Sequence, residues 1–311
     1  MKLIFLGTPQ IAVKTLDALA SHFDIVCVIT ATDKPVGRSG ALEPSPVSEK
    51  ALSLGLNCIK PEKLDHSVVT YLKSLDADYF VTFAYGKIFK PEFLTIAKSG
   101  GINIHPSLLP EYRGASPMQQ AIADGKKKSG ITVQKIVLEV DSGDVLDTVN
   151  FDINDDDDIV SVEKLVSELA SELIVKVLKA MQAADICGVK QDESKAVYCR
   201  KIEKADGVID WSDSAYTIFN AVRAYTSWPV CSTVVDGKKL NIVKASVIKL
   251  EDTGRAKPGT VLYADKQHGI VVQCGELSAL KIVRLQLQGK NILDAKDFIN
   301  GFRDLQGRVL G

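Results

Sequence analysis

The chain has 311 residues, of which 46% are hydrophobic and 25% are charged, and its formal net charge is -1. This composition excludes a disordered chain, and the length is sufficient for two domains. A net charge near zero gives no general attraction to nucleic acid, although local basic patches can still supply it. The six cysteines contain no Cys-x-x-Cys pair, so neither a zinc ribbon nor a disulfide framework is indicated.

The start of the chain carries no sign of a membrane span or an export signal. The apolar run from Leu3 to Leu6 is too short to cross a bilayer, and Lys2 is followed by neither a long apolar region nor a small-residue cleavage site. We therefore expect a cytoplasmic protein. The four histidines are scattered along the chain, so we expect no metal centre.

Over residues 2–181, short β-branched runs alternate with amphipathic segments, which favours a mostly parallel sheet flanked by helices. The expected strands span residues 2–6, 25–30, 78–82 and 101–104. Helical spacing of apolar residues predicts helices over residues 11–20 and 68–75. In such sheets ligands gather at the carboxyl ends of the strands, and His105 lies at such an end.

An antiparallel hairpin is expected to extend this sheet. Its strands cover residues 131–138 and 145–151, and Asp141 lies in the turn between them. The acidic run 154–158 then precedes a long amphipathic segment at 159–181. Acidic residues cap the free amides of a helix start and complement its dipole, so we interpret the run as the start of a helix. A metal site is the less favoured alternative.

The pattern changes after residue 181. Residues 188–204 are polar and aperiodic, as in a linker, and Trp211 begins a second hydrophobic unit. There we expect a helix at 213–224, followed by strands at barrel-like spacing over residues 230–235, 241–248, 259–262, 270–273 and 280–286. The predicted domains are 1–187 and 206–311, joined by a linker over 188–205.

Asn103 and His105 form the centre of a candidate active site. Side chains alternate along a strand, so these two point the same way while Ile102 and Ile104 face a core. When an amine attacks a formyl carbonyl, the carbonyl oxygen becomes an oxyanion, which an Asn amide stabilises without adding charge. His105 can be a second donor, or it can move the proton that the attacking amine loses. Asp141 would orient the imidazole.

Each of these residues alone is more often structural. Asn and His at a strand end commonly satisfy local backbone groups, and residues 141–144 alone are typical of a polar turn. Their combination favours acyl transfer. No Gly-x-Ser-x-Gly elbow occurs and no cysteine neighbours a histidine, so direct transfer is simpler than a covalent intermediate. Gly7 follows the first strand, but the later glycines of a dinucleotide loop and a Walker sequence are absent.

Four stretches of the chain carry a family resemblance. They are residues 5–9, residues 35–38 with 44–47, residues 103–110 with Arg113-Gly114, and residues 138–144. The last two are typical of folate-dependent formyltransferases in general. The first two, with Ile209-Asp210-Trp211 and Trp228-Pro229, point to the enzymes that act on tRNA. From residue 1 nearly to 311, the chain thus resembles the methionyl-tRNA formyltransferase family.

This resemblance implies that 10-formyltetrahydrofolate is the formyl donor and that the α-amine of methionyl initiator tRNA is the acceptor. It implies catalytic roles for Asn103, His105 and Asp141. It also implies folate contacts for Ser107, Leu108, Leu109 and Pro110, although the two leucines can alternatively be ordinary core residues.

The fold that the resemblance implies is α/β. A mostly parallel, Rossmann-like formyltransferase sheet carries helices on both faces, and a C-terminal OB-like β-barrel domain follows it. The barrel would help to hold the tRNA. We expect a monomer that has no membrane partner.

In the family, a loop inserted after the second strand is usually basic and enters the tRNA acceptor stem. Arg38 is the expected tRNA contact here, but Gly40, Ala41 and Glu43 occupy positions where Lys or Arg is common. Fewer phosphate contacts would flatten the salt dependence of tRNA binding, since each neutralised phosphate adds about 0.7 to 0.9 to the slope.

Two other functions remain open. One is a formyltransferase for a small amine, such as an amino sugar nucleotide. The other is a non-catalytic RNA-binding module, which would leave Asn103, His105 and Asp141 without a chemical role. A screen of acceptors with one folate donor distinguishes these possibilities.

Overall fold

The computed structural model describes residues 1–36, 40–183, 188–249, 256–302 and 304–311. It divides into two compact units. Unit 1 comprises Met1–Pro117, Lys128–Asp152 and Glu163–Arg200, and unit 2 comprises Met118–Lys127, Ile153–Val162 and Lys201–Gly311. The boundaries at residues 187 and 206 stay a prediction. Among the described residues, no helix combines the length and the apolar character that crossing a membrane requires.

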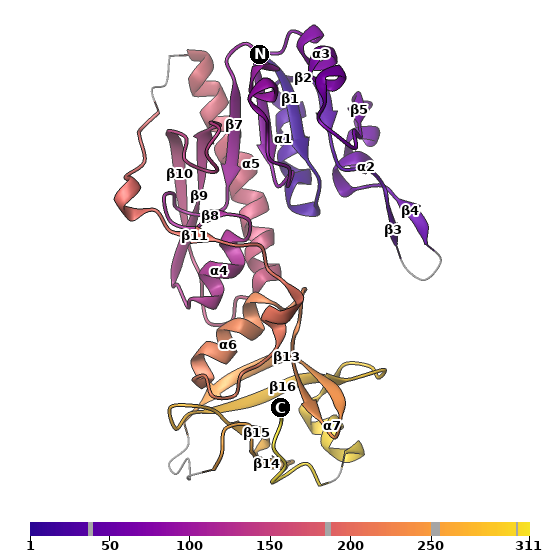
Figure 1. The fold of residues 1–311 in the computed structure, drawn as a ribbon, viewed down its shortest axis with the longest axis vertical. Coiled ribbons are helices and arrows are strands. Elements are labelled where there is room, and N and C mark those ends of the chain that lie inside the picture. The colour runs from indigo at the N-terminus through magenta and orange to yellow at the C-terminus, as the bar shows by residue number, and fades with distance from the viewer. Residues whose placement is uncertain (37–39, 184–187, 250–255, 303) are drawn as a thin grey trace. The chain divides into compact units, whose positions relative to one another are not determined.

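Unit 1 is built on a seven-stranded sheet with the spatial order β10-β9-β7-β6-β1-β2-β5 (Figure 1). Its strands are β1 (Lys2–Gly7), β2 (Asp24–Ile29), β5 (Cys58–Ile59), β6 (Tyr79–Phe83), β7 (Gly101–His105), β9 (Lys128–Lys135) and β10 (Val145–Asp152). The neighbouring strands β5, β2, β1, β6 and β7 run parallel to one another. Strand β9 runs antiparallel to both β7 and β10. This confirms the mostly parallel sheet and the antiparallel hairpin at its edge.

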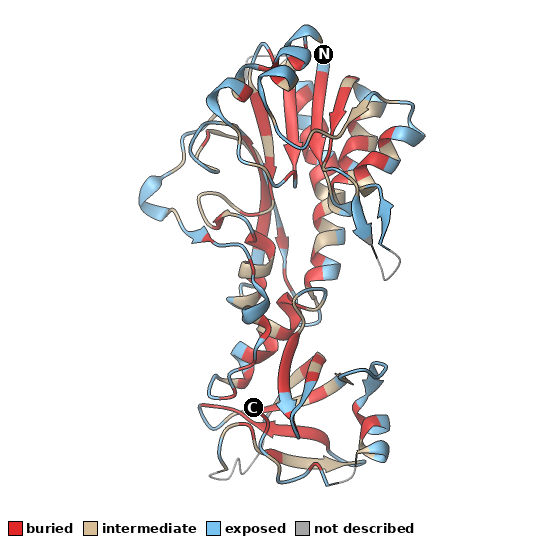
Figure 2. Ribbon diagram, turned by 45° about the vertical axis from the view of Figure 1, so that its right-hand side comes forward, coloured by how far each residue is buried: buried red, intermediate tan, exposed pale blue. Residues whose placement is uncertain are grey.

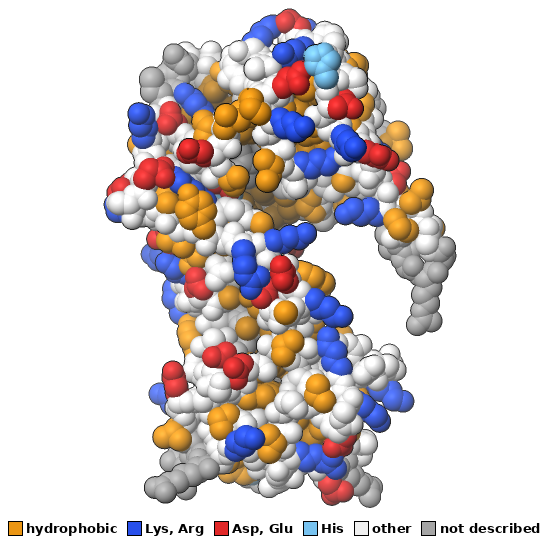
Figure 3. All heavy atoms as spheres, viewed as in Figure 1, with side chains coloured by type: hydrophobic (Ala, Val, Ile, Leu, Met, Phe, Trp, Pro, Cys, Tyr) orange, Lys and Arg blue, Asp and Glu red, His pale blue; other side chains and the backbone are white. Residues whose placement is uncertain are grey.

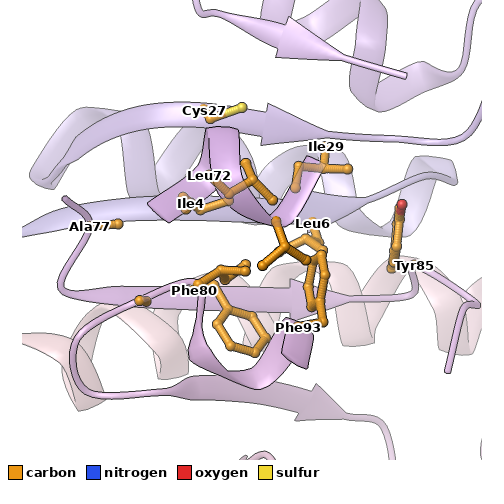
Figure 4. Close-up of a cluster of buried hydrophobic side chains, with 12 residues drawn as sticks. Ile4, Leu6, Cys27, Ile29, Leu72, Ala77, Phe80, Tyr85 and Phe93 are labelled. Carbon is orange, nitrogen blue, oxygen red and sulfur yellow. The ribbon is translucent and has the colours of Figure 1, made fainter. Parts of the chain in front are cut away.

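Both faces of the central strands are buried, which explains their continuous apolar sequences (Figure 2). Ile4 and Leu6 pack with Phe80 and with Leu72 of α3 in one cluster (Figure 4). Phe5 points to the opposite face by strand alternation and is also fully buried. Helices therefore cover the sheet on both sides.

The helical segments of unit 1 connect the parallel strands. They are η1 (Gln10–Ala12), α1 (Val13–His22), α2 (Pro46–Ser53), α3 (His66–Ser74) and η2 (Pro91–Thr95), while α4 (Pro117–Ala123) and α5 (Ile159–Ala183) contribute residues to both units. Ser167 of α5 donates a hydrogen bond to the carbonyl oxygen of Ile11, which places α5 beside η1. The predicted helices over 11–20, 68–75 and 159–181 are confirmed.

Two short strand pairs lie outside the main sheet. The hairpin of β3 (Lys34–Val36) and β4 (Ala41–Glu43) is the insertion after β2, and β4 is exposed throughout (Figure 2). Arg38, whose sequence position is between these two strands, lies outside the described residues. The other pair joins β8 (Arg113–Gly114) to β11 (Tyr198–Cys199) in parallel. The sequence predicted only a linker at β11, because two residues give no periodicity.

Unit 2 contains an antiparallel sheet with the order β12-β13-β16-β15-β14, and β17 also pairs with β16. The strands are β12 (Cys231–Val235), β13 (Lys238–Ile248), β14 (Val261–Asp265), β15 (Gly269–Gln273), β16 (Ala279–Leu287) and β17 (Leu293–Asp294), and the helices are α6 (Ala215–Ala224) and α7 (Ala295–Gly301). The predicted helix and the C-terminal β domain are confirmed. Closure into an OB-like barrel stays a prediction.

The acidic run before α5 forms a helix start. The carboxylate of Asp158 accepts hydrogen bonds from the backbone N–H groups of Val160 and Ser161, each at 3.0 Å. It therefore satisfies two amides that have no partner inside the helix. This confirms the helix-start interpretation of residues 154–158.

We expect Ser214→Ala to destabilise unit 2. The Ser214 hydroxyl caps α6 by accepting a hydrogen bond from the N–H of Thr217 at 3.1 Å. Loss of such a cap costs about 1 kcal/mol of the free energy of unfolding, which urea denaturation measures. Ser74→Ala is the matched control, because that exposed hydroxyl donates only to Tyr71 of its own helix. Equal stability of the two variants would contradict the capping role.

Candidate active site

Strand β7 presents the two candidate catalytic side chains at its carboxyl end. It lies between β6 and β9, and Ile102 and Ile104 are buried on one of its faces. Asn103 and His105 point from the opposite face. The strand begins at Gly101, where a Cβ would lie 2.1 Å from the Phe80 ring, so only glycine fits there.

The Asp141 carboxylate joins these two side chains. Its Oδ1 accepts hydrogen bonds from Asn103 Nδ2 at 3.2 Å and from Gln134 Nε2 at 3.0 Å. Its Oδ2 accepts from the backbone N–H of Gly114 at 2.9 Å and lies 3.5 Å from His105 Nδ1. The structure thus brings Asn103, His105 and Asp141 together in one cluster.

The backbone around this cluster is left-handed at several residues. Asp141 has φ 53° and Tyr112 has φ 60°, and Gly114 has φ 115°. A Cβ at Gly114 would lie 2.2 Å from the carbonyl oxygen of Cys199, so a side chain cannot be accommodated there. Positive φ values cost free energy in residues other than glycine, and they persist where surrounding contacts hold them.

His105 is 4% exposed, and both of its ring nitrogens face acceptors. Nε2 lies 2.8 Å from the carbonyl oxygen of Tyr112, and Nδ1 faces Asp141. A carbonyl oxygen only accepts hydrogen bonds, so Nε2 carries a hydrogen in this arrangement. Nδ1, whose 3.5 Å contact with Asp141 is longer than an ordinary hydrogen bond, is then the nitrogen that is left to exchange a proton with a substrate.

The segment after β7 is tied to β9. The Ser107 hydroxyl donates to the carbonyl oxygen of Glu111 at 2.6 Å, and Thr132 Oγ1 donates to the carbonyl oxygen of Ser107 at 2.7 Å. Thr132 Oγ1 also accepts from the N–H of Leu109 at 3.1 Å. Leu108, Leu109 and Pro110 are half-buried. A Cβ at Gly130 would meet Leu108 at 2.3 Å, so this leucine packs on β9.

Three residues of this region, Gln134, Gln191 and Arg113, had no predicted role. Gln134 faces Asn103 across the β7–β9 pair and binds Asp141. Gln191 lies in the predicted linker and donates to the carbonyl oxygen of Asp141, and it accepts from Arg113. The residue types alone carry no signal for these contacts. The register of the hairpin would have indicated Gln134, but a sequence does not fix a register.

Three buried thiols of the described residues are poor candidates for a competing nucleophile. Burial raises the pKa of Cys27, Cys231 and Cys274 to about 12, so these thiols stay protonated near neutral pH. The cluster of Asn103, His105 and Asp141 offers an amide donor, an imidazole and a carboxylate instead. Those groups can stabilise an oxyanion and move a proton. Among the described residues, no three His, Cys, Asp or Glu side chains are grouped as metal ligands.

Solved structures share the fold of this chain. A sugar 3N-formyl transferase aligns over 94% of this chain and 99% of its own, with 17% identity and a TM-score of 0.66. An N-formyltransferase from Helicobacter canadensis aligns over 90% and 98%, with 20% identity and a TM-score of 0.67. HypX from Aquifex aeolicus aligns over 97% of this chain and 47% of its own, with 19% identity and a TM-score of 0.65.

Sequence comparisons are more specific. Residues 1–178 match the formyl transferase family, and residues 201–303 match the formyl transferase C-terminal domain. The chain is 39% identical to the methionyl-tRNA formyltransferase of Caldicellulosiruptor saccharolyticus over 100% of both chains. It is 39% identical to that of a Sulfurihydrogenibium species over 97% of both and 38% identical to that of Borrelia duttonii over 99% of both. The chain therefore belongs to the methionyl-tRNA formyltransferase family of formyl-group transferases.

Proposed function

We propose that this enzyme transfers the formyl group of 10-formyltetrahydrofolate to the α-amine of methionyl initiator tRNA, as a monomer in the cytoplasm. The observation that carries the proposal is the contact of Asn103, His105 and Asp141 in one cluster at the end of β7. Similarity over the whole length to enzymes named for methionyl-tRNA supports the acceptor. Folate ligands in two fold neighbours, tetrahydrofolic acid with HypX and folinic acid with the Helicobacter canadensis enzyme, support the donor.

The proposed transfer is direct. The α-amine nitrogen forms a bond to the formyl carbon, and the bond from that carbon to N10 of the folate then breaks. The amine loses a proton and N10 gains one, so no further reactant is needed. This scheme requires a donor for the oxyanion and a group that moves the proton.

The three side chains divide these roles. One amide hydrogen of Asn103 is bound to Asp141, and the second can point to the oxyanion. His105 Nδ1 takes the proton of the attacking amine and returns it to N10. Asp141 holds both groups in place, because its two oxygens contact Asn103 and His105 respectively.

The folate and tRNA contacts follow from the family resemblance. We place the folate against Ser107, Leu108, Leu109 and Pro110. The last three have half-buried apolar side chains, which together with the backbone groups of the segment suit a pteridine ring. We assign the tRNA to Arg38 and to unit 2. On the face shown in Figure 3, Lys and Arg side chains recur along unit 2 among acidic side chains. Such a surface supports phosphate contacts at separate points.

An acceptor screen tests the proposed function. The enzyme is incubated with 10-formyltetrahydrofolate and with methionyl initiator tRNA, methionyl elongator tRNA or an amino sugar nucleotide in parallel. We expect formylmethionine on the initiator tRNA and no product on the sugar. Formylation of the sugar with no product on tRNA would favour the small-amine alternative, and no product on any acceptor would reject formyl transfer.

We expect Arg38→Ala to weaken the use of tRNA more than the binding of folate. Removing one phosphate contact lowers the slope of log affinity against log salt by about 0.7 to 0.9. The measurement is the KM for methionyl-tRNA at several salt concentrations, together with the Kd for the folate. Lys14→Ala, at an exposed position of α1, is the control. An equal loss of tRNA use and folate binding would show that Arg38 is structural.

A further inference from the structure

Residues 188–200, which we call the strap, are fixed to the candidate active site at both ends. Val189 and Val145 exchange two backbone hydrogen bonds of 2.8 Å, and Val145 lies four residues after Asp141. At the other end, β11 pairs with β8, whose Gly114 N–H donates to the Asp141 carboxylate. The strap is therefore bound both to β10, which follows Asp141 in the chain, and to β8, which contacts the Asp141 carboxylate.

Between these ends, the Gln191 side chain holds the backbone of the Asp141 loop. Its Nε2 donates to the carbonyl oxygen of Asp141 at 2.8 Å and to that of Gly143 at 2.7 Å. The same nitrogen lies 3.3 Å from Oε1 of Gln134, which itself binds the Asp141 carboxylate. Gln191 thus binds the backbone of the residue whose side chain holds Asn103 and His105.

Arg113 fixes the other end of the Gln191 amide. Gln191 Oε1 accepts from Arg113 Nε at 3.1 Å and from Nη2 at 2.8 Å. The Arg113 side chain is 1% exposed, and a buried cation is tolerated where it is paired. Its pair is the exposed carboxylate of Glu193, at 2.7 and 2.8 Å. The orientation of Gln191 is therefore set by a guanidinium that is itself held in place.

The ion pair persists in mild acid. The hydrogen bond from Arg113 lowers the pKa of Glu193, so the stabilising contribution is present above the ordinary carboxylate pKa and is lost only as the pH falls through the lowered one. At neutral pH the chain of contacts from Glu193 to the Asp141 loop is complete.

We propose that Gln191 is a positioning residue, which acts through the Asp141 loop on formyl transfer. The left-handed backbone at Asp141 needs surrounding contacts to hold it, and Gln191 supplies two of them. Loss of its donor group releases the loop, so the carboxylate no longer aligns Asn103 and His105. This inference rests on the proposed function for its assay.

Gln191→Glu removes the hydrogen-bond donor of the side chain and keeps its acceptor. A carboxylate still accepts from Arg113, so the strap stays attached, but it has no hydrogen for the carbonyl oxygens of Asp141 and Gly143. We expect kcat for formyl transfer to fall about 10- to 100-fold, because small misplacements of catalytic groups have effects of this size. The KM values for folate and tRNA should stay close to those of the wild type, whereas the thermal midpoint should fall, because the carbonyl oxygens of Asp141 and Gly143 lose their donor.

Gln182→Glu is the charge-matched control, because Gln182 is exposed near the end of α5. Wild-type and Gln182→Glu enzymes must both formylate the tRNA, and failure of both would reject the proposed function and not the role of Gln191. An unchanged kcat in Gln191→Glu beside active controls would overturn the positioning role. If Gln191→Glu does not fold, Gln191→Met is measured instead, and an unchanged kcat in that variant would overturn the role equally.

Discussion

His105→Ala is expected to lower the rate of formyl transfer by a factor on the order of 10² to 10⁴. The imidazole lies at the carboxyl end of β7, it is 4% exposed, and its Nδ1 faces the Asp141 carboxylate. Without it, the attacking amine has no group to take its proton. The single-turnover rate at saturating folate and methionyl-tRNA measures this step separately from product release.

Two controls accompany this variant. His22→Ala removes an exposed imidazole whose Nδ1 contacts only the backbone of its own helix, and we expect the wild-type rate for it. The tRNA affinity of His105→Ala should also stay close to that of the wild type. A rate within a few-fold of the wild type would contradict the proton-transfer role. A parallel loss of tRNA affinity would show that His105 acts on binding.

Asn103→Ala is expected to raise the barrier of the transfer step by about 2.7 to 4 kcal/mol, which is the cost of removing one oxyanion donor. This corresponds to a rate lower by a factor of about 10² to 10³. The reason is the amide group, which binds Asp141 with one hydrogen and has a second hydrogen for the developing oxyanion. The rate is again measured in a single turnover.

The matched control for this variant is Asn57→Ala, an exposed asparagine whose amide binds Tyr71. It should transfer the formyl group at the wild-type rate. If Asn103→Ala instead raises the KM for folate with an unchanged kcat, its amide binds the ground state equally well and is no oxyanion donor.

Much of the fold could be predicted because the central strands are buried on both faces. Strands such as β1 and β2 have short apolar sequences, and α3 has a clear helical spacing of Val69 and Leu72. The two-residue strands β8 and β11 have no such pattern, because their pairing depends on residues 85 positions apart in the chain. Short elements of this kind are fixed by tertiary contacts.

The candidate site could likewise be predicted from the sequence only in part. Side-chain alternation along β7 predicted that Asn103 and His105 share a face, and the turn between β9 and β10 supplied Asp141. The contribution of Gln191 could not be predicted, because a polar and aperiodic segment is typical of a linker. Its contacts depend on how residues 188–200 cross the Asp141 loop, and no local sequence pattern encodes such a crossing.

The most direct test of the catalytic cluster is the coupling energy between Asn103 and His105. The single-turnover rate of the double variant Asn103→Ala/His105→Ala is compared with the rates of the two single variants. Because one carboxylate holds both side chains, we predict barrier changes that deviate from their sum by about 0.5 to 3 kcal/mol. Changes that add to within about 0.3 to 0.5 kcal/mol would show that the two residues act independently, and would contradict the account.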